Sequence, residues 1–98
     1  MKLLEVFKII KEQNLTKDQL EDYHKELSEL RGQMRLELAE ITKKKAMFML
    51  SNPELSVAQR KIDWGGTNEG QREIDLKAYI GATSDNLGSL KSRLYSIY

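Results

Sequence analysis

Apolar residues recur every three or four positions over most of the chain, which is the spacing of one face of an α-helix. The first such group predicts a short amphipathic helix over about residues 2–13. Its apolar residues are Leu3, Leu4, Val6, Phe7, Ile9 and Ile10. A helix of about three turns is not stable alone in water. We therefore expect it to pack against another part of the chain.

A much longer helix is expected next, over about residues 17–50. Thr16 is a suitable N-cap, and Gln19, three residues later, completes a capping box. The chain from Lys17 to Leu50 contains no proline and one glycine, Gly32. Its main apolar stripe has a spacing of seven and consists of Leu20, Leu27, Met34, Ile41 and Phe48. A helix of this length measures about 50 Å at 1.5 Å per residue.

Pro53 predicts the end of the long helix, because the residue before a proline disfavours the α region. We expect residues 51–67 to form a turning segment at a tip. A short helix is expected there from Glu54 to Asp63, with Ser56 as its cap. The residues expected to face inward from it are Val57 and Ile62.

A return helix is predicted over about residues 68–97. Trp64-Gly65-Gly66 is expected to break the chain before it, and Thr67 is suited to cap it. Its apolar stripe alternates spacings of four and three, through Leu76, Ile80, Thr83, Leu87, Leu90, Leu94 and Ile97. Gly81 and Gly88 lie next to this stripe. Because glycine inside a helix costs about 1 kcal/mol relative to alanine, we interpret them as a place where another backbone comes close.

These elements predict an all-α fold, an elongated antiparallel helical hairpin with a short N-terminal helix at its base. A length of 98 residues fits a single domain, residues 1–98.

The long helix carries a second stripe on the side opposite its main one, formed by Gly32, Leu36, Ala39 and Ala46. A two-helix hairpin does not use this face. It could receive the N-terminal helix or meet another copy of the protein. Alternatively, the alanines are only good helix formers on a solvated face. We favour self-association and predict a homodimer through this face.

Charge and composition exclude several classes of function. The 16 Lys and Arg and 15 Asp and Glu residues leave a net charge of +1, which argues against binding nucleic acid or membrane through the whole surface. With no cysteine and one histidine, His24, the chain has neither a thiol nor a histidine cluster for catalysis or metal binding. No cofactor motif is present, so we expect no cofactor. Acidic pairs such as Glu69 and Glu73 are expected to be solvated or paired with Lys and Arg.

The location suggested by the sequence is the cytoplasm. Glu5 and Lys8 interrupt the apolar start that a secretory signal requires. The longest apolar run, Ala46 to Leu50, is far shorter than the roughly 20 residues of a membrane span. We therefore expect no contact with a membrane.

Basic residues gather around the predicted tip. Between residues 43 and 72 there are six basic and three acidic residues. Together with an aromatic residue, they form a candidate contact set for a partner or nucleic acid: Lys43, Lys44, Lys45, Arg60, Lys61, Trp64 and Arg72. The alternative is that lysines near a helix C-terminus favour its dipole, while Trp64 fills the end of the hairpin against Phe48 and Ile62.

Three short segments carry a resemblance. Ser51-Asn52-Pro53 ends the long helix, Thr67-Asn68-Glu69-Gly70-Gln71-Arg72 opens the return helix, and Leu90-Lys91-Ser92-Arg93-Leu94 lies near its end. This layout, over residues 17–98, resembles small helical proteins encoded by bacteriophages and prophages. The resemblance implies a phage accessory protein in the host cytoplasm, without catalytic residues. Its partners could include host or phage replication, recombination or defence proteins.

Our leading hypothesis is therefore a non-enzymatic protein of phage type that acts by protein–protein contact. The alternative is an accessory factor that binds nucleic acid through the basic tip. A small enzyme is disfavoured, because the sequence offers no catalytic constellation.

Overall fold

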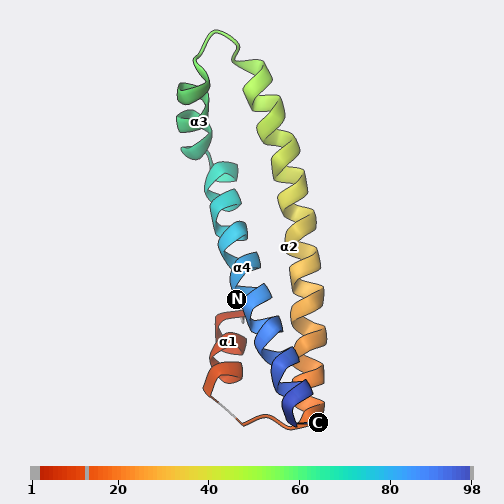
Figure 1. Ribbon diagram of the computed structural model, residues 1–98. Coiled ribbons are helices and arrows are strands. Elements are labelled where there is room, and N and C mark those ends of the chain that lie inside the picture. The colour runs from red at the N-terminus through yellow and green to blue at the C-terminus, as the bar shows by residue number, and fades with distance from the viewer. Residues whose placement is uncertain (1–2, 13, 98) are drawn as a thin grey trace. The chain divides into compact units, whose positions relative to one another are not determined.

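The computed structural model describes residues 3–12 and 14–97, and this part of the chain is helical with no strand (Figure 1). The elements are α1 (Leu3–Glu12), α2 (Lys17–Ser51), α3 (Val57–Gly65) and α4 (Asn68–Ile97). The predicted all-α class is confirmed, and α2 and α4 agree with their expected bounds to within one residue. Residues 2 and 13, the expected ends of the first helix, lie outside the described residues. In the described part of the chain, no helix has both the length and the apolar character needed to cross a bilayer.

The chain divides into two compact units, and α2 and α4 contribute to both. We call residues 33–79 the central unit. The terminal unit consists of residues 1–32 and 80–98.

In the terminal unit, α1 is held by contacts to α4. The Arg93 guanidinium donates a hydrogen bond to the Ile10 carbonyl at 2.5 Å. Farther along, Arg31 of α2 donates to the Ser84 hydroxyl of α4 at 3.1 Å, while Lys17 of α2 and Tyr95 of α4 line one cleft. The segments of α2 and α4 in this unit therefore run antiparallel. The apolar core of this unit consists of Leu3, Val6, Ile10, Leu15, Leu20, Leu27, Leu87 and Leu90.

The start of α2 has the predicted capping box. The Thr16 hydroxyl accepts from the Gln19 N–H at 3.2 Å, and the Gln19 side chain accepts from the Thr16 N–H at 2.9 Å. This reciprocal pair satisfies two backbone donors that the first turn of a helix leaves without partners.

In the central unit, ion pairs between α2 and α4 show that these segments also run antiparallel. Glu37 pairs with Arg72, and Lys44, two turns later in α2, pairs with Glu69, which is earlier in α4. The buried apolar residues of this unit are Met34, Ile41, Trp64 and Leu76.

Both predicted apolar stripes face inward over most of their length. In α2, four residues of the stripe are buried and Phe48 is half-buried. In α4, Leu76, Thr83, Leu87 and Leu90 are buried, whereas Ile80 and Leu94 are half-buried. The side chain of Ile97 lies outside the described part.

The sequence-based prediction for α3, Glu54 to Asp63, was wrong in its bounds and in its inward face. Ser56 is the N-cap as expected, with its hydroxyl accepting from the Gln59 N–H at 3.1 Å. The helix continues through Trp64, because the Gly66 N–H closes its last turn on the Ile62 and Asp63 carbonyls. Ile62 is 68% exposed, since it lies about 200° around the helix from the buried Trp64.

Val57, the other residue expected to face inward from α3, is also exposed. The inward position one turn before Trp64 is taken by Arg60, which is half-buried. Its guanidinium donates to the Met49 carbonyl at 2.7 Å. A polar anchor to the end of α2 therefore takes the place of the expected apolar contact.

The close backbone approach expected at Gly81 and Gly88 is absent among the residues that the structure describes. A Cβ atom built at either glycine would meet nothing within 4 Å, and both positions are exposed. In the single chain, the two glycines therefore give α4 no packing advantage over alanine.

Candidate partner-binding surface

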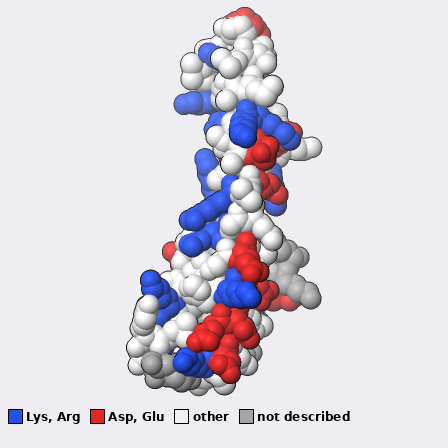
Figure 2. Space-filling model, turned by 90° about the vertical axis from the view of Figure 1, so that its right-hand side faces the viewer, with Lys and Arg blue, Asp and Glu red and all other residues white. Residues whose placement is uncertain are grey.

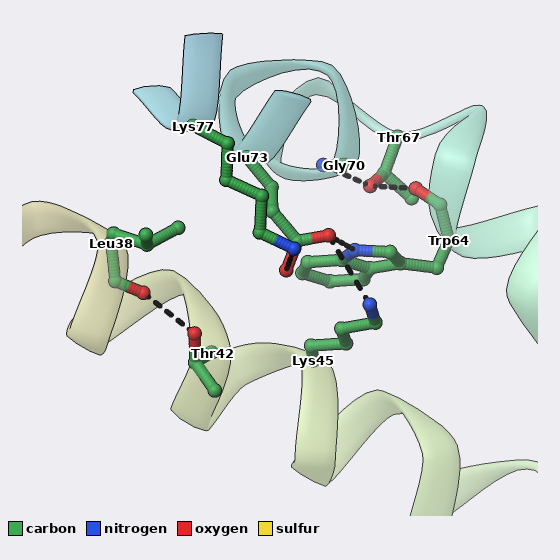
Figure 3. A network of polar contacts seen from close by, with 8 residues as sticks. All are labelled: Leu38, Thr42, Lys45, Trp64, Thr67, Gly70, Glu73 and Lys77. Carbon is green, nitrogen blue, oxygen red and sulfur yellow. Dashed lines mark hydrogen bonds and ion pairs between the residues drawn. The ribbon is translucent and has the colours of Figure 1, made fainter. Parts of the chain in front are cut away.

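The central unit is organised around the buried carboxylate of Glu73 (Figure 3). One carboxylate oxygen accepts a hydrogen bond from the Lys45 ammonium at 3.2 Å and another from the Trp64 indole N–H at 3.3 Å. The other oxygen lies 4.0 Å from the ammonium of Lys77. This one side chain therefore joins α2, α3 and α4.

Burial and these donors act on the pKa of Glu73 in opposite directions. Burial alone would raise the pKa, because it disfavours the charged form. The hydrogen bonds from Lys45 and Trp64, with the charges of Lys45 and Lys77, outweigh this effect and lower the pKa of Glu73 below its ordinary value. The carboxylate is therefore ionised at neutral pH.

Trp64 lies inside the central unit and is 5% exposed. Its ring packs against Phe48 with centroids 5.6 Å apart and a tilt of 54° between the planes. This agrees with the alternative in which Trp64 fills the end of the fold, although Ile62 does not join it. As a buried side chain, Trp64 offers no ring to a partner at the surface.

The junction between α3 and α4 is closed by hydrogen bonds of Thr67. Its hydroxyl donates to the Trp64 carbonyl at 2.6 Å and accepts from the Gly70 N–H at 3.0 Å, so it caps α4 as predicted. Gly70 is buried, and a Cβ atom there would collide with the Trp64 carbonyl oxygen. The absence of a side chain at position 70 therefore lets α4 begin directly against the end of α3.

The basic residues predicted around the tip are nearly all paired within the central unit. Lys45 and Arg60 make the contacts described above. The remaining ion pairs of this set are Lys43 with Glu40 at 3.7 Å, Lys44 with Glu69 at 3.9 Å and Arg72 with Glu37 at 2.6 Å. Among the described residues, Lys61 alone of the seven candidates has neither an ion pair nor a hydrogen bond nor a ring contact.

The surface charge reflects this pairing. On the face shown in Figure 2, Lys and Arg side chains are interspersed with Asp and Glu side chains. The hydrogen bond from Arg72 also holds the pKa of Glu37 below its ordinary value, so that pair is charged at neutral pH. A phosphate at this surface would have to compete with carboxylates already in place.

The central unit also carries large apolar side chains on its surface. Six large apolar residues in this unit are between 57% and 79% exposed: Leu36, Met47, Leu50, Val57, Ile62 and Ile74. In the described part of the terminal unit, two residues are comparable, Leu4 and Tyr95. Exposed apolar side chains mark a protein–protein contact site where they lie together in one patch.

The predicted self-association face of α2 is uncovered. Gly32, Leu36, Ala39 and Ala46 are all exposed, as is Leu50 one turn after Ala46. The sequence suggested that either the N-terminal helix or another copy of the protein covers this face. The N-terminal helix leaves these positions exposed.

His24 lies half-buried in the wall of a cleft in the terminal unit. The cleft has a volume of about 480 Å³ and is lined by Lys17, Glu21, His24, Lys25, Lys91, Leu94 and Tyr95. In the part of the chain that the structure describes, no three His, Cys, Asp or Glu side chains are placed to hold a metal ion.

Sequence reasoning missed the central position of Glu73, which it treated as solvated or paired. The pairing with Lys45 agrees with that expectation, but the burial does not. A signal was present, because the alternating spacing of α4 extends backwards from Leu76 to position 73.

Comparisons of the chain with protein-family models, with curated proteins and with solved structures found no match.

Proposed function

We propose that this chain is a non-enzymatic accessory protein that acts by protein–protein contact through its central unit. The observation that carries the proposal is the set of six exposed large apolar side chains in residues 33–79. Burying one such side chain completely is worth about 1.5–3 kcal/mol. Burying several of them would therefore offset a substantial part of the free-energy cost of association.

The proposal includes a homodimer as the form in which the protein acts, an antiparallel helical hairpin as its fold and the cytoplasm as its location. The antiparallel order of α2 and α4 in each unit supports the hairpin. The exposed face of α2 supports self-association. The resemblance to phage-encoded helical proteins suggests a host or phage protein as the partner.

The alternative function, nucleic-acid binding at the basic tip, has less support. Four of its seven residues, Lys43, Lys44, Lys45 and Arg72, pair with carboxylates. Binding a phosphate chain there would require breaking these pairs, which reduces the gain from counterion release.

A matched set of variants tests the proposal. Val57→Ser with Ile62→Ser changes two exposed residues of α3, and Leu4→Ser changes an exposed residue of α1 as the control. In affinity capture from a bacterial lysate, we expect partners held by the wild type and by Leu4→Ser to be lost with the α3 variant. Equal capture by all three would contradict a contact through α3.

A labelled single-stranded oligonucleotide tests the alternative on the same proteins. We expect no saturable binding at physiological salt. Binding that weakens steeply with salt, with a smaller salt dependence in Lys61→Gln, would instead favour the nucleic-acid function.

A further inference from the structure

We propose that the outer face of α2 in the central unit binds the same face of a second copy, with the two helices antiparallel and crossing at Ile41. The inference rests on the self-association in the proposed function and names its geometry. The face consists of Leu36, Ala39, Lys43, Ala46 and Leu50, with spacings of three and four, and all five residues are exposed. Ile41 itself points to the other side of α2, into the core.

Side-chain size alternates along this face, and the alternation determines the orientation of the two helices. One row of the face has large side chains with a spacing of seven, Leu36, Lys43 and Leu50. The row beside it has small side chains with the same spacing, Ala39 and Ala46. A parallel pair would set each residue beside its own copy. Lys43 would then face Lys43 of the second copy, and the alanines would face each other across a gap. An antiparallel pair sets large residues against small ones, so the side chains can interlock.

The crossing point follows from the order of the residues. When the helices cross at Ile41, a residue before it meets the residue equally far after it in the other copy. Leu36 then meets Ala46, five positions on either side, and Ala39 meets Lys43, two positions on either side. By the same count along α2, Leu50 meets position 32, where the sequence has a glycine. This register places both leucines against small residues.

The charges on this face agree with the antiparallel arrangement. In the single chain, the Lys43 ammonium lies 3.7 Å from Glu40, and both side chains are largely exposed. In the proposed pair, the aliphatic stem of Lys43 covers Ala39 of the second copy, and its ammonium stays at the rim. Glu40 of the second copy follows that Ala39 directly, so the ammonium also gains an acidic neighbour across the interface.

A second copy explains this pattern better than an unrelated partner does. A twofold contact uses one patch twice, so the patch must be complementary to itself. With Gly32 included, the order is small, large, small before Ile41 and large, small, large after it, and this order has the property. An unrelated protein would place no such condition on α2.

Sedimentation of size-swapped variants tests the interlocking. Ala46→Leu makes the face more apolar, yet we expect it to weaken the dimer at least tenfold, because two leucines would collide. Adding Leu36→Ala to Ala46→Leu exchanges the large and small partners and should restore the dimer. Ala58→Leu, at an exposed position of α3, is the control and should leave the dimer unchanged. A tighter dimer with Ala46→Leu alone would overturn the proposed packing.

Disulfide formation tests the orientation, because the natural chain has no cysteine. We expect Ala39→Cys and Lys43→Cys chains to cross-link when mixed and oxidised, with little cross-linking of Ala39→Cys alone. In the antiparallel pair, the two copies of residue 39 are offset by about 6 Å along the axis, which disfavours a disulfide. Efficient cross-linking of Ala39→Cys with itself would indicate a parallel pair and overturn the proposal.

The failure of this inference can be told apart from failure of the proposed contact with a partner protein. A wild-type chain that sediments at 11.4 kDa at micromolar concentration would overturn the dimer. Capture of a partner through Val57 and Ile62 uses other residues, so the capture experiment tests it independently.

Discussion

Glu73 is a buried charge that the fold tolerates because three donors surround it. Two of them, the Lys45 ammonium and the Trp64 indole, lie within hydrogen-bonding distance. A buried carboxylate without such partners would be strongly unfavourable. The contact between α3 and the two long helices therefore depends on Glu73 remaining ionised.

Acid should loosen the central unit by protonating this carboxylate. The pKa of Glu73 is lower in the folded protein than in the unfolded chain, so its contribution to stability is complete above the unfolded pKa. The contribution is lost as the pH falls through the folded pKa, which lies below the ordinary glutamate value. Fluorescence of Trp64, the sole tryptophan, should report this transition.

Glu73→Gln isolates the effect of the charge. We expect the free energy of unfolding at neutral pH to fall by about 1–3 kcal/mol, because Lys45 and Trp64 lose their ionised acceptor. Glu69→Gln is the control, since Glu69 is exposed and its pair with Lys44 is 3.9 Å long. Equal stability of the two variants would mean that Glu73 is not the centre of the network.

Trp64→Ala should destabilise the protein by about 3–5 kcal/mol, as large-to-small aromatic changes in cores do. The wild-type emission maximum should lie well to the blue of tryptophan in water, since the ring packs on Phe48. Trp64→Phe keeps an apolar ring but loses the donor to Glu73, so its stability should be intermediate. A nearly unchanged melting temperature with Trp64→Ala would contradict the interior position.

At the scale of the element, glycines in α4 should respond in opposite ways to the same substitution. Gly70→Ala would drive a Cβ atom into the Trp64 carbonyl, so we expect it to destabilise the junction of α3 and α4. Gly81→Ala and Gly88→Ala have open space and should each stabilise α4 by about 0.5–1 kcal/mol. Thermal unfolding of the three variants measures the difference.

The result at Gly81 and Gly88 also bears on assembly. Alanine at these positions should leave the sedimentation of the protein unchanged if the dimer forms through α2. Loss of the dimer with Gly88→Ala would show instead that another backbone approaches α4, as the sequence alone suggested.

Helix starts could be predicted from the sequence because their signals are local. The Thr16 box, the Ser56 cap and the Thr67 cap each depend on residues a few positions apart. The inward face of α3 could not be predicted in this way. That face depends on Arg60 reaching the Met49 carbonyl and on Trp64 reaching Glu73, which are contacts between different helices.

At the candidate site too, local features could be predicted from the sequence, whereas contacts between helices could not. The sequence located the basic residues of the tip, but composition gives no information about pairing. The carboxylates of Glu37, Glu69 and Glu73 come from α2 and α4, and only the fold brings them to their lysine and arginine partners. The exposed face of α2 could be predicted, because a second stripe on one helix follows from spacing alone.

At the scale of the whole molecule, assembly and stability should be coupled. A small domain has a folding free energy of only about 5–15 kcal/mol, so burying exposed leucines against a second copy is a substantial addition. Because only the folded chain forms this interface, mass action should raise the melting temperature as the protein concentration increases.

A melting series from about 1 to 100 μM measures this coupling. The wild type and Ala58→Leu should melt at higher temperature as concentration rises, whereas Ala46→Leu should show a weaker dependence. The chain with both Leu36→Ala and Ala46→Leu should recover it, because the exchange restores one large and one small residue in each contact. If the melting temperature of Ala46→Leu depended on concentration as strongly as that of the wild type, the interface would lie away from α2. No other described surface is altered in that variant. Melting temperatures independent of concentration in every chain would show that the exposed face of α2 does not join two copies.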